Sequence, residues 1–316
     1  MPSIMSYLTD ILYRKEPKAP PPPPPPGITT ATAILLLVLY TLLYVVPFYL
    51  SPRTRPSPTL SRDAPSVIRA RIASVTVTCA AASLITFYVL VSRGRYGNAD
   101  VFHAMGYWPA GAPEALRALL LTALLFTGPL FESLVAEGGW RDWLALGPVK
   151  EVMNEITAWR NIVAGPLTEE VLFRSAAIPL MVLARTPLAT TIFVSPLVFG
   201  LAHVHHFYEF RVSSRGPVPV SAALLRSAFQ LGYTSVFGAY ATFVYLRTGS
   251  LLAVFAVHVL CNCVGLPRVW GRVRGPARFR ESDGRWLAPA PLGRAWSMAY
   301  YVLLVAGAAA WWRGLE

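Results

Sequence analysis

The chain has 316 residues, of which 54% are hydrophobic and only 14% charged, and its formal net charge is +12. Soluble domains carry about 25% charged residues, so this composition and a mean hydropathy of +0.48 exclude an ordinary soluble domain and predict a membrane protein. The basic residues lie in short stretches between apolar runs, without the basic face of a nucleic-acid-binding domain. We therefore expect contact with anionic lipid and no nucleic-acid partner.

The N-terminal segment, residues 1–27, is polar and ends in a run of seven prolines at 20–26. Consecutive prolines adopt a stiff, extended conformation, so this run predicts a spacer ahead of the membrane. We expect residues 28–316 to form a single transmembrane bundle.

Eight apolar stretches follow that approach the 20 or so residues needed to cross a bilayer. They predict an all-α membrane protein with about eight transmembrane helices in one bundle. The fourth stretch is interrupted by Glu169, Glu170 and Arg174. Polar groups at membrane depth usually face a bundle interior or a wet cavity, so we expect an internal polar cavity. The predicted spans are 31–50, 72–91, 116–135, 162–183, 188–205, 222–246, 251–267 and 296–312.

The loops after the odd-numbered spans carry roughly twice as many Lys and Arg residues as the opposite side of the membrane. The positive-inside rule then predicts that these loops lie in the cytosol and that both termini lie on the other side.

A pair of glutamates in the fourth span is the first candidate site. Glu170 and Arg174 are four residues apart with the acid first, which is the favourable order for an ion pair on a helix. Glu169 lies about 100° around the helix and stays free of that pair, so it is a candidate general base. The alternative is a purely structural Glu170–Arg174 clamp, in which Glu169 has no role.

Histidines at the end of the fifth span form the second candidate site. His203 and His206 are three residues apart, so a metal site has to be considered. A zinc site usually needs three or four ligands at known spacings, and no His-Glu-x-x-His pattern occurs in the sequence. We expect no metal ion here. The alternative to a functional role is that these histidines are simply interfacial residues at the end of the span.

The seventh span contributes His258 and Asn262, which are four residues apart and so share one helix face. Two polar side chains on one face of a membrane helix need a partner or a function, and a hydrogen bond to another helix is the simpler explanation. The predicted topology places Glu169, His203 and His258 near the cytosolic side of their spans. This shared depth favours a common site.

Together the three motifs resemble those of the type II CAAX prenyl endopeptidases, a branch of the glutamate-dependent intramembrane proteases. The core motifs lie within 159–267, where Trp-Arg-Asn at 159–161 and Ala-His-Val-His-His at 202–206 resemble the eukaryotic branch. The residues that carry the resemblance are Glu169, Glu170 and Arg174 (Glu-Glu-x-x-x-Arg), Phe199 and His203 (Phe-x-x-x-His), and His258 and Asn262 (His-x-x-x-Asn).

The resemblance implies an intramembrane endopeptidase that removes the last three residues from proteins whose C-terminal CaaX cysteine carries a farnesyl or geranylgeranyl group. It implies prenylated CaaX proteins, such as small-GTPase-like substrates, and membrane lipids as partners. It also implies the endoplasmic reticulum membrane, with the site open towards the cytosol. No cofactor is expected.

The side chains suggest a mechanism. We expect Glu169 and His203 to hold and polarise a water that attacks the scissile carbonyl. His258 and Asn262 would donate hydrogen bonds to the developing oxyanion, while Glu170, Arg174 and Phe199 support the site.

Two other functions remain open at this stage. One is a zinc-dependent membrane hydrolase that uses His203, His206 and either Glu169 or Glu170. The other is a transporter or scaffold with an internal polar network. Transporters often contain an internal repeat, and none is visible in this sequence.

Overall fold

A computed structural model describes residues 25–57, 59–213, 218–276, 278–280 and 285–315. Helices build this part of the chain, as predicted, except for a small antiparallel hairpin of β1 (Arg278–Arg280) and β2 (Arg285–Leu287) that was not predicted. The prolines at 20–24 and the rest of the N-terminal segment up to that point lie outside the described residues.

All eight predicted spans fall on helices. The first four correspond to α2 (Thr30–Val45) with α3 (Pro47–Leu50), α4 (Pro65–Gly94), α6 (Ala112–Leu125) with α7 (Thr127–Leu130) and η1 (Phe131–Ala136), and the run from η2 (Arg160–Ala164) through α11 (Gly165–Glu170) and η3 (Val171–Ala176) to α12 (Ala177–Leu183). The last four correspond to η4 (Thr190–Val194) with α13 (Ser195–Ala202) and η5 (His203–His205), α15 (Val220–Thr248), α16 (Leu251–Val264) and α17 (Arg294–Gly314). Short helices connect them: α5 (Asn98–Ala104), α8 (Trp140–Leu144), α9 (Gly147–Asn154), α10 (Ile156–Trp159) and α14 (His206–Ser213).

Three helical stretches of the described chain are long and apolar enough to cross a membrane: Thr30–Leu50, Pro65–Gly94 and Arg294–Gly314. A fourth counts if α6 and the helical turns after it form one span. The structure therefore supports a helical membrane protein with three or four candidate spans, and the number eight stays a prediction.

The predicted third span is not straight. The helix Ala112–Leu125 and the helix Thr127–Ala136 meet at an angle of 81°. Pro129 has no N–H to donate to the carbonyl of Leu125, four residues earlier, and the Thr127 hydroxyl donates to the Leu303 carbonyl at 2.8 Å. Proline thus removes a helical bond at the break, and α17 holds the bent chain.

Two of the helices that carry the sequence motifs contain π-helical turns: η2 and η3 lie in the run that ends with α12, and η4 leads into α13. Each of these turns ends two or three residues before a proline, namely Pro166, Pro179 and Pro196. Because proline cannot donate to the carbonyl four residues before it, a locally widened turn lets the helix continue without that bond. Such turns are frequent at functional sites.

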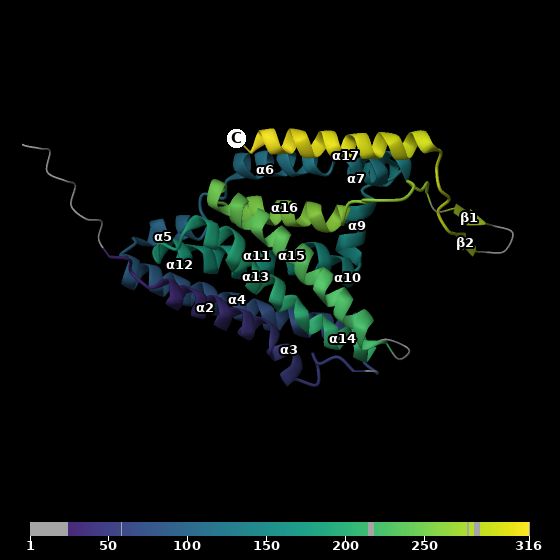
Figure 1. Ribbon diagram of the computed structural model, residues 1–316. Helices are drawn as coiled ribbons and strands as arrows, with labels where there is room; N and C mark the ends of the chain where they lie inside the picture. Colours follow the sequence, from purple (N-terminus) through teal and green to yellow (C-terminus); the bar gives the residue numbers. More distant parts are fainter. Residues whose placement is uncertain (1–24, 58, 214–217, 277, 281–284, 316) are drawn as a thin grey trace, which may run out of the picture.

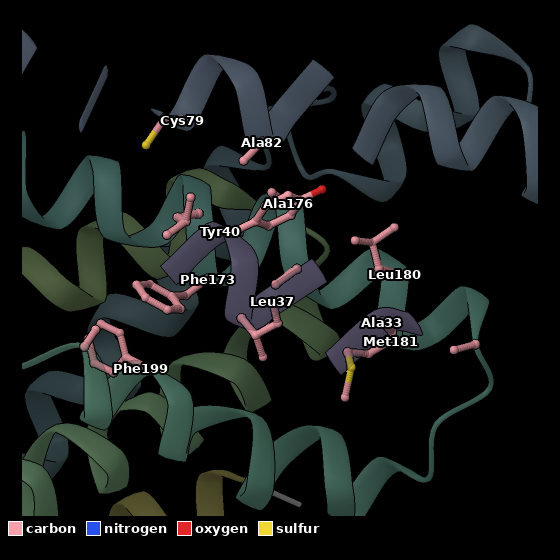
Figure 2. Packing of buried hydrophobic residues seen from close by; sticks show 14 residues of the cluster. Ala33, Leu37, Tyr40, Cys79, Ala82, Phe173, Ala176, Leu180, Met181 and Phe199 are labelled. Atoms are coloured by element: carbon pink, nitrogen blue, oxygen red, sulfur yellow. The ribbon is translucent and has the colours of Figure 1, made fainter. Parts of the chain in front are cut away.

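The core cluster in Figure 2 packs α2 and α4 against the helix that runs from η2 to α12. Leu37 and Tyr40 from α2 meet Ala82 from α4 and Ala176 from η3, and all four are almost fully buried. The small alanines allow the helix backbones to approach closely, as is common between membrane helices. This packing fixes the helix that carries Glu169.

The outer surface is apolar. Leu84 and Val77 on α4 are 70% and 69% exposed, and Val305 on α17 is 69% exposed. Soluble proteins rarely expose apolar surface on this scale, which supports a membrane protein. Figure 1 shows α17 lying along α6 and α7, with α16 and α15 between them and the layer of α2 and α4.

Candidate functional site

The centre of the molecule holds a buried carboxylate with two donors. Glu170 Oε1 accepts hydrogen bonds from Arg174 Nη1 at 3.0 Å and from His258 Nδ1 at 2.7 Å. The side chains of Glu170 and Arg174 are 0% and 1% exposed. The predicted ion pair within the helix is confirmed, and it includes a histidine from another helix that the sequence did not indicate as its partner.

Arg174 is enclosed on all sides. Its guanidinium lies over the rings of Phe199 and Phe237, at 4.7 Å and 5.7 Å from the ring centroids, and Nη2 donates to the Gly238 carbonyl at 3.2 Å. Aromatic faces attract such a cation. Phe199 therefore supports the site as a wall beside Arg174, and α15 contributes two residues that sequence motifs did not identify.

His258 connects the two neighbouring glutamates. Its Nδ1 donates to Glu170, and its Nε2 lies 3.9 Å from Glu169 Oε2. The ring of Phe237 packs against it with centroids 4.5 Å apart. The buried glutamate thus sets the orientation of the imidazole, whose other nitrogen is directed at the second glutamate.

Glu169 is the accessible member of the pair. Its side chain is 22% exposed, against 0% for Glu170, and it lines a cavity of about 1620 Å³ that also touches His203, His258 and Asn262. The sequence predicted this division of the two carboxylates from helical geometry alone. The structure brings the four residues to one cavity.

His203 has a defined tautomer. Its Nδ1 is 2.9 Å from the Phe199 carbonyl, which can only accept, so Nδ1 carries the proton and donates it. The ring packs edge-on against Phe199 with centroids 4.9 Å apart. In the neutral ring Nε2 then keeps a lone pair that can accept a hydrogen bond from water in the cavity.

Asn262 is engaged differently from the other site residues. Its Nδ2 donates to the main-chain carbonyl of Asn161 at 3.0 Å, which links α16 to η2. A side-chain amide has a second N–H, so Asn262 keeps one donor. The structure thus gives this residue the helix–helix bond that was the simpler explanation of its pattern, besides a place in the cavity lining.

A second polar cluster, not identified from the sequence, lies at another part of the cavity wall. Glu209 Oε2 accepts from His206 Nδ1 at 2.8 Å and from Arg62 Nη1 at 3.1 Å, while Arg71 Nη1 lies 2.6 Å from Oε1. Burial raises the pKa of Glu209, but the His206 hydrogen bond and the Arg71 charge outweigh it and hold the pKa well below 4.5. Arg62, Arg71 and His206 all line the cavity.

The structure groups possible metal ligands differently from the zinc hypothesis. Among the residues that it describes, His205, His206 and Glu209 are the group whose donor atoms lie within 4.8 Å of one another. Two arginines already neutralise Glu209, which disfavours a cation there. His203, His206 and Glu169 or Glu170, the ligands of the zinc hypothesis, do not form such a group in the described residues.

Comparison with known proteins gives the context of this site. Residues 114–264 match the family described as type II CAAX prenyl endopeptidase Rce1-like, and the match includes Glu169, His203, His258 and Asn262. A probable CAAX prenyl protease 2 of Schizosaccharomyces pombe is 37% identical over 234 residues, which cover 74% of this chain and 81% of the relative. The chain belongs to the type II CAAX prenyl endopeptidase family.

Other relatives with the same name are also similar to this chain. The CAAX prenyl protease 2 of Homo sapiens is 36% identical over 69% of this chain and 68% of its own length. That of Saccharomyces cerevisiae is 28% identical over 84% of this chain and 89% of the relative. No solved structure gives a significant match. Membership of a family of proteases favours an enzyme over the transporter or scaffold alternative.

Proposed function

We propose that this protein removes the C-terminal aaX tripeptide from farnesylated or geranylgeranylated CaaX proteins. Family membership supports the reaction class. The observation that carries the assignment to this site is the accessible Glu169 beside His258 Nε2, 3.9 Å away on the wall of a large cavity.

In the proposed mechanism Glu169 takes a proton from a water that also donates to Nε2 of His203. The water oxygen attacks the carbonyl of the prenylated cysteine, and the proton passes to the leaving amine when the peptide bond breaks. Glu170 anchors His258 through Nδ1. His258 stabilises the oxyanion when Nε2 also carries a proton, and the second N–H of Asn262 is the other proposed donor.

The same cavity has an apolar wall suited to an isoprenoid. Residues from α6, α15 and α17 line it, among them Leu125, Phe229, Tyr233 and Trp311. Burying an isoprenoid against such side chains contributes about 25 cal/mol per Å² of apolar surface. This lining supports lipid-modified substrates over soluble peptides.

We further propose that the bundle crosses the endoplasmic reticulum membrane with eight spans and that the site opens towards the cytosol. Support comes from the helices found at all eight apolar stretches and from the excess of basic residues in the odd-numbered loops.

The test is cleavage of a farnesylated CaaX peptide by the purified protein in lipid nanodiscs. We expect release of the tripeptide, about a thousandfold loss in Glu169→Gln, and much weaker cleavage of the unprenylated peptide. Arg69→Gln is the control, since Arg69 is exposed and not among the cavity residues. Equal cleavage of both peptides would overturn the substrate class. Loss of activity on chelation and its return with zinc would instead favour a metalloenzyme.

A further inference from the structure

Three arginines line the cavity that contains Glu169: Arg62, Arg71 and Arg160. Within the described residues, two carboxylates pair with them. Glu209 binds Arg62 and Arg71, and Asp63 Oδ1 accepts from Arg160 Nη1 at 2.8 Å. This wall of the cavity therefore has one more arginine than carboxylate, and the surplus favours an anion there.

Arg71 is not available for that anion. It pairs with Glu209, and its Nε and Nη2 both donate to the Thr54 carbonyl, at 3.0 Å and 2.8 Å. Its side chain is only 12% exposed. Arg71 therefore builds the wall and holds Glu209.

Arg160 is fixed but has free donors. Its Nε donates to Asn161 Oδ1 at 3.0 Å, and its Nη1 donates to Asp63 and to the Arg62 carbonyl. In the described part of the chain Nη2 has no hydrogen-bond partner, and the side chain is 21% exposed. Asp63 is itself 55% exposed and can yield to a competing carboxylate. Arg62 lies alongside, with its side chain 35% exposed.

A widened helical turn brings Arg160 to the same cavity as Glu169. Arg160 precedes Glu169 by nine residues, which is two and a half turns of a regular α-helix and would place the two on opposite faces. The π-helical stretch η2 begins at Arg160 and turns less per residue. Both side chains consequently line one cavity.

The spacing matches the released fragment. Nine residues rise at most about 13 Å along this partly π-helical stretch, since a widened turn rises less per residue than an α-helix, and three residues of extended peptide span about 10 Å. A C-terminal carboxylate held by the arginine side chain therefore leaves the bond before a tripeptide close to Glu169. A fragment shorter or longer by one residue changes the span by about 3 Å.

We propose that Arg160, with Arg62 beside it, binds the free C-terminal carboxylate of the substrate and so sets the length of the released peptide at three residues. The inference rests on the proposed function. Asn161 orients Arg160 through its side chain and accepts from Asn262 through its carbonyl, so the carboxylate site and the site of cleavage share one anchor.

The experiment compares two farnesylated CaaX peptides that differ only in their end, a free carboxylate or a carboxamide. For the wild type we expect kcat/KM to fall by about 10- to 100-fold on amidation, the effect of losing a charge-assisted hydrogen bond. For Arg160→Gln we expect kcat/KM on the acid peptide to fall by a similar factor relative to the wild type. On the amide peptide this variant should be nearly as active as the wild type. Arg160→Lys keeps the charge but lacks the paired N–H donors of the planar guanidinium, so it should retain part of the preference for the acid peptide over the amide.

The outcomes separate the two proposals. If the wild type cuts neither peptide, the proposed function fails. If it cuts the acid and the amide equally well, the carboxylate site fails while the proposed function stands, and this comparison needs no variant to fold. If Arg160→Gln lowers both rates by the same factor and keeps the acid preference, Arg160 has only a structural role. Arg69→Gln, an exposed arginine outside the cavity, is the matched control and should keep the wild-type ratio.

The length of the fragment gives an independent check. A farnesylated peptide with four residues after the cysteine should be cut at least tenfold more slowly than the CaaX peptide by the wild type. In Arg160→Gln this difference should shrink to about threefold or less. An undiminished difference in that variant would show that another part of the cavity measures the length.

Discussion

Two carboxylates in this molecule have nearly the same partners, yet only one lies beside a second, accessible carboxylate. Glu170 binds Arg174 and His258 Nδ1, and Glu209 binds two arginines and His206 Nδ1. The difference is a neighbour: His258 Nε2 faces the accessible Glu169 at 3.9 Å. A buried Glu–His–Arg group is thus a structural anchor by itself, and the proposed mechanism depends on the second, accessible carboxylate beside it.

The largest effect should come from the uncommitted carboxylate. Glu169→Gln keeps the shape of the side chain but removes the base, so we expect kcat to fall by about a thousandfold while the melting temperature changes little. Activity with a farnesylated CaaX peptide and thermal unfolding in the same detergent measure both. A fall in stability with activity retained would reverse the assigned roles of Glu169 and Glu170.

The anchor should behave in the opposite way. Glu170→Ala leaves Arg174 buried without its carboxylate, which destabilises by about 3–5 kcal/mol, and it frees His258 to rotate. We expect a clear fall in melting temperature together with lost activity. The isosteric Glu170→Gln keeps a hydrogen-bond acceptor and should recover part of the stability, which a purely catalytic role for Glu170 would not produce.

The second cluster gives a test by pH. The pKa of Glu209 lies below 4.5 in the fold, so its ion pairs stabilise the protein above about pH 4.5 and are lost as the pH falls through the lowered value. Glu209→Gln should destabilise by about 2–3 kcal/mol at pH 7. The difference in free energy of unfolding between this variant and the wild type, measured from pH 7 down to pH 3, should become smaller at the acid end. A gap that stays constant would mean that the charge of Glu209 does not stabilise the fold.

The smallest effect concerns how closely α13, which leads into His203, approaches α15. A Cβ at Gly200 would overlap Ser235 Oγ and lie 2.8 Å from Leu231 Cδ1. We expect Gly200→Ala to destabilise by about 1–3 kcal/mol and to lower activity by shifting His203. Gly232 on α15 has open space at the Cβ position, so Gly232→Ala should be neutral or slightly stabilising. Equal effects of the two substitutions would show that the close approach is not needed.

Sequence reasoning succeeded where the geometry is local. Glu170 and Arg174 pair because they are four residues apart on one helix, and the same periodicity turns Glu169 away. It could not supply contacts that depend on the packing of distant helices. His258 meets Glu170 across 88 residues, and Asn262 meets Asn161 across 101.

Backbone irregularities also limited the prediction. The 81° bend near Pro129 could be suspected from the proline, but its angle depends on the bond from Thr127 to α17. The π-helical turns shift the faces of the motif helices, so periodicity of 3.6 residues misplaces residues such as Arg160. Glu209 has no motif around it, and its role follows only from the arginines that surround it.

The enclosed guanidinium of Arg174 also bears on how the chain enters the membrane during synthesis. A charged residue at the centre of a helix raises the free energy of insertion by about 2.5–3.5 kcal/mol, and this helix carries Glu169, Glu170 and Arg174. Glu170 and Arg174 neutralise each other within the helix, but their other hydrogen-bond partners are translated later: the Gly238 carbonyl follows Arg174 by 64 residues and His258 follows Glu170 by 88. In the proposed eight-span topology we therefore expect the helix that runs from η2 to α12 to stay beside the insertion machinery until α15 and α16 have emerged, so that these helices enter the bilayer as a group.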